Sequence, residues 1–168
     1  YDKDLIETLV KQRVPATVFV TKKWIAKNKE RMATLLAHPA LFQIENHGAE
    51  HIPAALGSDA SVYGLKAAGT VQALQREVEG GAEAIVNAGA ARPTWYRGAT
   101  ARYDAASLKE IARLGYRVAG FSVNADVGAT LPRRAIVQRL LAVRPGDIVI
   151  AHMNKPASET AEALQEAL

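Results

Sequence analysis

The chain has 168 residues, 49% of them hydrophobic, and carries a formal net charge of +4 at pH 7. This length fits one domain with one sizeable core, and no run approaches the roughly 20 apolar residues of a membrane-spanning helix. The absence of cysteine excludes disulfides, thiolate nucleophiles and cysteine-ligated zinc.

The basic charge suits an acidic partner such as a cell-wall polymer, an anionic polysaccharide or a nucleic acid. The basic residues are scattered, however, and their longest clusters are the pairs Lys22-Lys23 and Arg133-Arg134. Because no stripe of Lys and Arg is interleaved with aromatic residues, we do not expect a nucleic-acid partner. A solvated basic surface is the simplest interpretation. The first residues also lack the basic start and apolar stretch of a signal peptide.

The first half of the chain alternates helices with short apolar strands. In chain order, the expected elements are a helix over 2–12, a strand over 16–20, helices over 22–27 and 29–37, a strand over 41–45 and a helix over 65–88. Asp2 or Asp4 would cap the first helix. Gly80 and Gly81 weaken the last one by roughly 1 kcal/mol each relative to alanine.

The second half continues the alternation. The expected elements are a strand over 93–97, a helix over 104–115, a strand over 116–123, a helix over 132–143, a strand over 148–151 and a helix from 158. Asp104 would cap the helix that follows it. Short apolar strands that alternate with helices predict an α/β domain with parallel strands, spanning 1–168 as a single domain. Periodicity alone does not separate a barrel from an open sheet, but in both the strand ends carry the chemistry.

His47 and His51 follow the strand over 41–45. On a helical turn, a spacing of four residues puts both imidazoles on one side, where they could bind one metal ion such as zinc, cobalt, iron or nickel. Glu45 and Glu50 would be further ligands or partners of the ligands, or simply solvated or capping groups. A structural histidine pair is the plain alternative.

Three later residues also lie at predicted strand ends. Arg97 follows Trp95 and Tyr96 and would hold a carboxylate through a forked contact, or lie on the surface. Asp126 follows the strand over 116–123, where turn formation explains it nearly as well. His152 directly follows the strand over 148–151 and has the placement of a general acid, with a packed core histidine as the alternative.

This order of residues resembles the polysaccharide deacetylase family, also described as the NodB-homology domain or carbohydrate esterase family 4. Residues 14–21 look like an early strand of the family, and 47–51 match its H-(S/T)-x-x-H motif with Gly48 in place of Ser or Thr. Arg97 and Asp126 fall where the third and fourth motifs lie. Ile150-Ala151-His152 resembles the L-x-H of the fifth motif.

The resemblance implies a distorted (β/α) barrel and a metal-dependent hydrolase that removes acetyl groups from an N- or O-acetylated carbohydrate. The implied roles are metal binding by His47 and His51, proton donation by His152, orientation of the base by Arg97, tuning of His152 by Asp126, and substrate binding by Ile150 and Tyr96. The implied cofactor is a divalent metal, zinc first. The implied setting is the periplasm or the cell exterior, with an acetylated carbohydrate or cell-wall polymer as partner.

The chain also departs from the family pattern. The first motif, which supplies the general base and an aspartate ligand, has no counterpart before the helix that begins near Tyr1. We therefore expect a barrel that is incomplete at its N-terminus, with the missing segment as a separate chain or an upstream sequence. Weak metal binding and little activity from these residues alone follow from that expectation. The alternatives are a catalytically impaired carbohydrate-binding domain and a metal-dependent amidase that acts on a non-sugar substrate.

Overall fold

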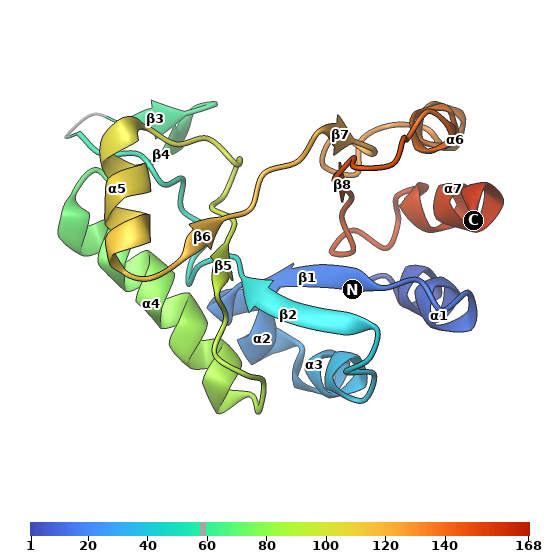
Figure 1. The fold of residues 1–168 in the computed structure, drawn as a ribbon, viewed down its shortest axis with the longest axis horizontal. Coiled ribbons are helices and arrows are strands. Elements are labelled where there is room, and N and C mark those ends of the chain that lie inside the picture. The colour runs from blue at the N-terminus through green and yellow to red at the C-terminus, as the bar shows by residue number, and fades with distance from the viewer. Residues whose placement is uncertain (58–59) are drawn as a thin grey trace. The chain divides into compact units, whose positions relative to one another are not determined.

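The computed structural model describes residues 1–57 and 60–168 (Figure 1). Its contacts divide the chain into two compact units. We call Thr17–Ala119 the central unit, and Tyr1–Ala16 together with Gly120–Leu168 the terminal unit. The expectation of a single catalytic domain over 1–168 stays a prediction, and each unit is described by itself.

A four-stranded sheet forms the middle of the central unit, with the strand order β1-β2-β5-β6. The strands are β1 (Ala16–Val20), β2 (Phe42–Asn46), β5 (Trp95–Tyr96) and β6 (Arg117–Val118). β5 pairs in parallel with both β2 and β6, and Asn46 lies opposite Tyr96. The alternation of helices and strands thus produces the predicted α/β arrangement with parallel strands.

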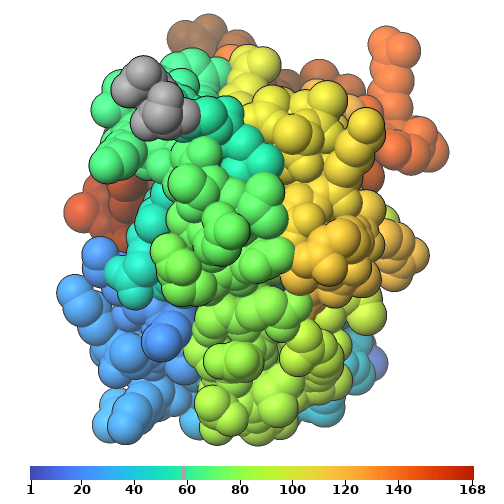
Figure 2. All heavy atoms as spheres, turned by 90° about the vertical axis from the view of Figure 1, so that its left-hand side faces the viewer, coloured from blue at the N-terminus to red at the C-terminus, as the bar shows by residue number. Residues whose placement is uncertain are grey.

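Four helices of the central unit pack around this sheet. They are α2 (Lys22–Lys27), α3 (Lys29–Leu36), α4 (Val71–Asn87) and α5 (Ala105–Arg113). Asp104 caps α5 as predicted and forms a reciprocal capping box with Ser107. α4 and α5 lie side by side, green and yellow in Figure 2. Their apolar faces share a buried cluster that includes Leu74, Val78 and Ile111.

The predicted helix over 65–88 is wrong in its first turn and a half. Leu65–Lys66 is strand β4, which pairs antiparallel with β3 (Ser61–Val62). The helix begins only at Val71, because the hydroxyl of Thr70 accepts a hydrogen bond from the Ala73 amide and caps it. The residues just before Thr70 therefore belong to the end of a hairpin and its exit rather than to the helix.

The terminal unit contains α1 (Lys3–Lys11), α6 (Arg133–Leu141) and α7 (Thr160–Ala167), with β7 (Val123–Asn124) paired in parallel to β8 (Val149–Ile150). The Asp2 side chain caps α1, as one of the two predicted capping residues. Ala125, Ile136, Val137 and Ala163 form its small core. This core holds the β7 end against α6 and α7.

Two strand predictions for this part of the sequence need correction. Residues 116–123 do not form one strand, because β6 and β7 are separate and belong to different units. The predicted strand over 148–151 is shortened to Val149–Ile150, and Ile148 is 56% and Val149 38% exposed. A sheet of two short strands leaves much of its own surface uncovered. No helix in the described part of the chain is long and apolar enough to cross a membrane.

Candidate active site

The loop after β2 carries His47 and His51 in the central unit. It is not the helical turn that the spacing of four suggested, because Gly48 has φ +90° and His51 has φ +64°. Both residues thus have left-handed backbone conformations, and the imidazole rings of His47 and His51 meet edge to face with centroids 4.7 Å apart. A left-handed conformation is uncommon for a residue with a side chain, and strain of this kind concentrates at functional sites.

A backbone carbonyl selects the tautomer of His47. Nδ1 of its ring contacts the carbonyl oxygen of Arg97, which follows β5. A carbonyl only accepts hydrogen bonds, so Nδ1 carries the proton and Nε2 bears the lone pair. Metal-binding histidines are typically held in this way, with the outer nitrogen donating to a carbonyl or carboxylate. In the neutral ring, Nε2 is therefore the His47 nitrogen whose lone pair a metal ion could use.

Hydrogen bonds to helix α4 hold the loop that carries His47 and His51. Gly48 N–H donates to Oδ1 of Asn46 (2.8 Å), and the amides of Glu50 and Ile52 donate to the carboxylate of Glu77 (2.9 and 3.0 Å). Glu77 is only 3% exposed. The position of both histidines thus depends on contacts with a buried acidic side chain.

Arg97 lies at the end of β5 and is 9% exposed. Its Nε donates to the Ala119 carbonyl (3.1 Å), and its guanidinium stacks 4.4 Å from the centre of the Phe19 ring. Burial lowers the pKa of Arg97, an effect that the nearby Tyr103 partly opposes. The Tyr103 hydroxyl accepts a hydrogen bond from the Gly98 amide (2.8 Å) and so fixes the turn after Arg97.

Tyr96, predicted to contact substrate, lies wholly inside the central unit. Its ring is fully buried among the apolar residues of α4 and α5. Burial raises the pKa of Tyr96 well above its usual value, and the negative charge of Glu77 adds to the shift. A substrate contact would require this ring to become exposed.

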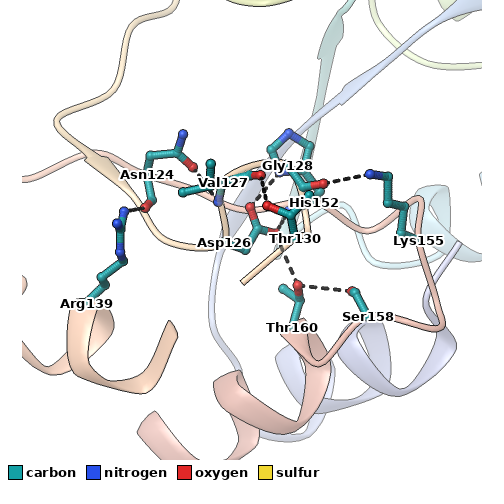
Figure 3. A network of polar contacts seen from close by, with 10 residues as sticks. All are labelled: Asn124, Asp126, Val127, Gly128, Thr130, Arg139, His152, Lys155, Ser158 and Thr160. Carbon is teal, nitrogen blue, oxygen red and sulfur yellow. Dashed lines mark hydrogen bonds and ion pairs between the residues drawn. The ribbon is translucent and has the colours of Figure 1, made fainter. Parts of the chain in front are cut away.

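Asp126 and His152 meet in the terminal unit at the ends of β7 and β8 (Figure 3). Nδ1 of His152 lies 2.7 Å from Oδ1 of Asp126, and the His152 amide donates to Oδ2 (2.7 Å). Asp126 is fully buried, whereas a third of the His152 side chain is exposed. Burial alone would raise the pKa of Asp126, but the hydrogen bonds from the His152 ring and amide outweigh it and lower the pKa.

Further polar contacts surround this pair. The hydroxyl of Thr160, the first residue of α7, donates to Oδ2 of Asp126 (3.2 Å). Lys155 Nζ donates to the Gly128 carbonyl (2.9 Å), which ties the loop after Asp126 to the loop after His152 (Figure 3). Ile150 lies opposite Asn124 in the sheet and is half-buried. The ionised Asp126 therefore directs one ring nitrogen of His152 inward and leaves Nε2 for outward proton exchange.

The donor set for a metal ion is limited to two imidazoles. Within residues 1–57 and 60–168, no three or more His, Asp or Glu side chains gather as a metal site. Glu45 is buried, and its carboxylate accepts from the amides of Thr94 and Trp95 (2.9 and 2.8 Å). Glu50 is exposed and lies 3.9 Å from Lys23. Neither acidic residue supplements the pair, but the tautomer of His47 and the closeness of the rings fit a divalent cation.

Three residues that support the site escaped the sequence analysis, namely Asn46, Glu77 and Thr160. For Glu77, the sequence does contain a feature that indicates a buried role. It lies on the buried face of α4, one turn from Leu74 and next to Val78. A carboxylate on an apolar helix face needs hydrogen-bond donors, which implies a docked loop. The short side chains of Asn46 and Thr160 carry no comparable signal.

Comparison with known proteins gives a consistent family. The sequence model described as polysaccharide deacetylase matches residues 1–119. No curated protein sequence matches the chain. The structure is similar to a family 4 carbohydrate esterase from Streptomyces lividans solved with acetate, with a TM-score of 0.78 and 17% identity over 98% of this chain and 79% of that one.

Two further solved structures extend the likeness. A family 4 carbohydrate esterase from Bacillus subtilis matches with a TM-score of 0.77 and 22% identity, over 99% of this chain and 67% of that one. A family 4 pseudoenzyme from Bacillus anthracis matches with a TM-score of 0.79 and 19% identity over 98% of this chain. The present chain spans only 53% of that pseudoenzyme. These similarities confirm the predicted fold class, that of the deacetylase (β/α) barrels.

Proposed function

Because the chain belongs to the polysaccharide deacetylase family, we propose that it is a hydrolase that removes acetyl groups from an N- or O-acetylated carbohydrate. The observation that carries this proposal is the edge-to-face pair of His47 and His51, with Nδ1 of His47 held by the Arg97 carbonyl. That arrangement has little structural purpose on a half-exposed loop, whereas it prepares two imidazoles to bind one cation.

His47 and His51 would hold a divalent metal ion, for which zinc is the first choice and cobalt, nickel or iron are alternatives. The chemistry that such an ion supplies is Lewis-acid polarisation of the acetyl carbonyl and of the attacking water. With two imidazoles as the described donors, we expect weaker binding than that of a three-ligand site. Arg97, buried and rigidly held, would orient the general base.

His152 would act as general acid. Its ring is fixed by the fully buried Asp126, so a proton on Nε2 can pass to the departing nitrogen or oxygen as the acyl C–N or C–O bond breaks. Ile150, two residues earlier and half-buried, would contact the acetyl methyl group. Proton delivery and acyl recognition would thus come from the same strand, β8.

The acetylated partner would be a carbohydrate or cell-wall polymer. One of the similar structures is that of a peptidoglycan deacetylase from Bacillus subtilis, with a TM-score of 0.76 and 19% identity over 98% of this chain. The excess of basic residues suits such an anionic polymer. We accordingly propose the periplasm or the cell exterior as the site of action.

The test is acetate release from acetylated chitooligosaccharides, peptidoglycan fragments and an acetylated small molecule, with and without added zinc. Loss of the imidazole in His47→Ala should abolish zinc-dependent release, and His152→Ala should reduce it about 100-fold. His38→Ala is the matched control, because the His38 ring contacts that of Phe42, away from the His47–His51 pair. Equal rates for the parent and His152→Ala would refute the acid role.

A second candidate function is carbohydrate binding without catalysis. It is favoured by the absence of a gathered third metal ligand in the described residues. The test is binding of the same oligosaccharides, measured by calorimetry without added metal. Binding with no acetate release at any zinc concentration would support this function and overturn the hydrolase.

A further inference from the structure

Glu77 places a carboxylate inside the protein, directly behind the histidine loop. It is 3% exposed and lies in the middle of α4, between Leu74 and Gly81 on the buried face. A buried carboxylate must be matched by hydrogen-bond donors, or its desolvation is costly. Here the donors are the amides of Glu50 and Ile52, at 2.9 and 3.0 Å. These two amides bracket His51, so Glu77 holds the backbone on both sides of that residue.

The backbone of Glu77 contributes a third bond. Its carbonyl accepts the Ala49 amide (2.9 Å), while the Val78 carbonyl accepts the side-chain amide of Asn46 (2.8 Å). The Oδ1 of Asn46 in turn accepts the Gly48 amide. The donors next to His47 and His51 are therefore fixed by one turn of α4.

Gly48 leaves the space that Glu77 fills. A Cβ atom added at Gly48 would collide with Oε1 of Glu77 and approach its Cδ to 2.9 Å. Gly48 also has φ +90°, a conformation that residues with side chains rarely adopt. This is the motif position at which the resemblance to the family leads one to expect Ser or Thr. The carboxylate thus occupies the volume that a motif side chain would take.

We propose that Glu77 is the positioning residue of the His47–His51 loop, and that its carboxylate does so from the space beside Gly48. The inference rests on the proposed function in so far as the loop binds a metal. In this role Glu77 would contact neither cation nor substrate, because both of its carboxylate oxygens accept from loop amides. It acts through the backbone of Glu50 and Ile52, which sets the direction of the His51 ring.

Zinc affinity and amide hydrogen exchange of residues 46–52 test the proposal. Glu77→Ala should weaken zinc binding 10- to 100-fold, the usual effect of losing an outer partner of a metal ligand, and should speed exchange at Glu50 and Ile52. Glu77→Gln keeps the shape and one acceptor oxygen, and should give an intermediate loss. Glu83→Gln is the control, because Glu83 is an exposed carboxylate on the same helix.

A double-variant cycle sharpens the test. Gly48→Ser alone should weaken zinc binding through its collision with Glu77. Combined with Glu77→Ala, the collision disappears while the backbone strain at φ +90° remains, so the combined loss should be smaller than the product of the two single losses. Unchanged affinity and exchange in Glu77→Ala, or purely additive losses, would overturn the proposal. If Glu77→Ala does not fold, Glu77→Gln decides by the same two measurements.

The outcomes separate this inference from the proposed function. A parent protein that binds no zinc refutes the metal-dependent hydrolase. Exchange at Glu50 and Ile52 then still shows whether Glu77 holds the loop, because that measurement needs no metal. Slow exchange in the parent and fast exchange in Glu77→Ala support the positioning role, and equal rates refute it.

Discussion

At the scale of single residues, His47 and His152 each have an acceptor that fixes the role of the Nδ1 atom. The Arg97 carbonyl can only accept, and the Asp126 carboxylate is held ionised by the groups that donate to it, so each histidine directs Nδ1 to its partner. Sequence located these histidines because they follow apolar strands. It did not reveal the carbonyl of Arg97 as a partner, since a backbone group looks the same at every position.

The Asp126 carboxylate accepts at both oxygens, from the His152 ring and amide and from Thr160. In Asp126→Asn one oxygen becomes an NH2 donor, which must face one of these donors. We expect a loss of about 1–3 kcal/mol in the free energy of unfolding and about 100-fold in zinc-dependent acetate release. Urea unfolding and the acetate assay measure both effects. Glu162→Gln, at an exposed position of α7, should change neither.

At the scale of elements, the two glycines of α4 decide how closely the histidine loop can approach the helix. Glycine in a helix is usually a weakness, which is how the sequence presents Gly80 and Gly81. In the structure, a Cβ at Gly81 would collide with Oδ1 of Asn46 and come within 2.7 Å of the Gly48 carbonyl carbon. Helical periodicity cannot reveal such an approach, because it depends on a loop 35 residues away in the chain.

The two adjacent glycines give a matched comparison. Gly80 would meet only the Ala49 Cβ at 3.3 Å. We expect Gly80→Ala to change the free energy of unfolding by less than about 1 kcal/mol, because the gain in helix propensity offsets this contact. Gly81→Ala should lower it by about 1–3 kcal/mol through overpacking. Urea unfolding of both variants measures the difference, and equal stabilities would contradict the close docking of the loop on α4.

Other elements separate the features that depend on neighbouring residues in the chain from those that depend on distant ones. Caps were read correctly at Asp2 and Asp104, because a capping side chain acts within its own turn. The start of α4 was misread, because pairing of β3 with β4 overrides the local pattern. The exposure of Ile148 is a further feature that composition does not predict, since burial depends on what packs against a strand.

At the scale of the whole molecule, the folded chain binds its protons less tightly than the unfolded chain at acid pH. Hydrogen bonds lower the pKa of Asp104 and Asp126 against the opposing effect of burial, and the Arg144 amide and Ser122 lower that of Asp147. Arg113 and Gln75 lower the pKa of Glu110 to about 2. Carboxyls in both units therefore favour the folded state only while they are ionised.

The sign of the pH dependence follows from these lowered values. A carboxyl whose pKa is lower in the folded state stabilises the protein fully above its unfolded pKa, about 3.9 for Asp, and loses that contribution as the pH falls through the folded value. We expect the free energy of unfolding to be flat near pH 6 and to fall steadily below about pH 4. Urea titrations between pH 2 and 7 measure it. Asp126→Asn should flatten this acid decline, whereas an unchanged slope would remove Asp126 from the set.

The contact between Glu77 and Gly48 also constrains how this sequence can change. A serine introduced at position 48 meets the carboxylate, and a shortened side chain at position 77 leaves the loop without its acceptor. Either single step passes through a damaged intermediate, so the two positions form an epistatic pair. A directed-evolution library built from single substitutions would discard both changes. A library that varies positions 48 and 77 together removes the collision, so that only the backbone strain at position 48 still opposes the hydroxyl-bearing motif.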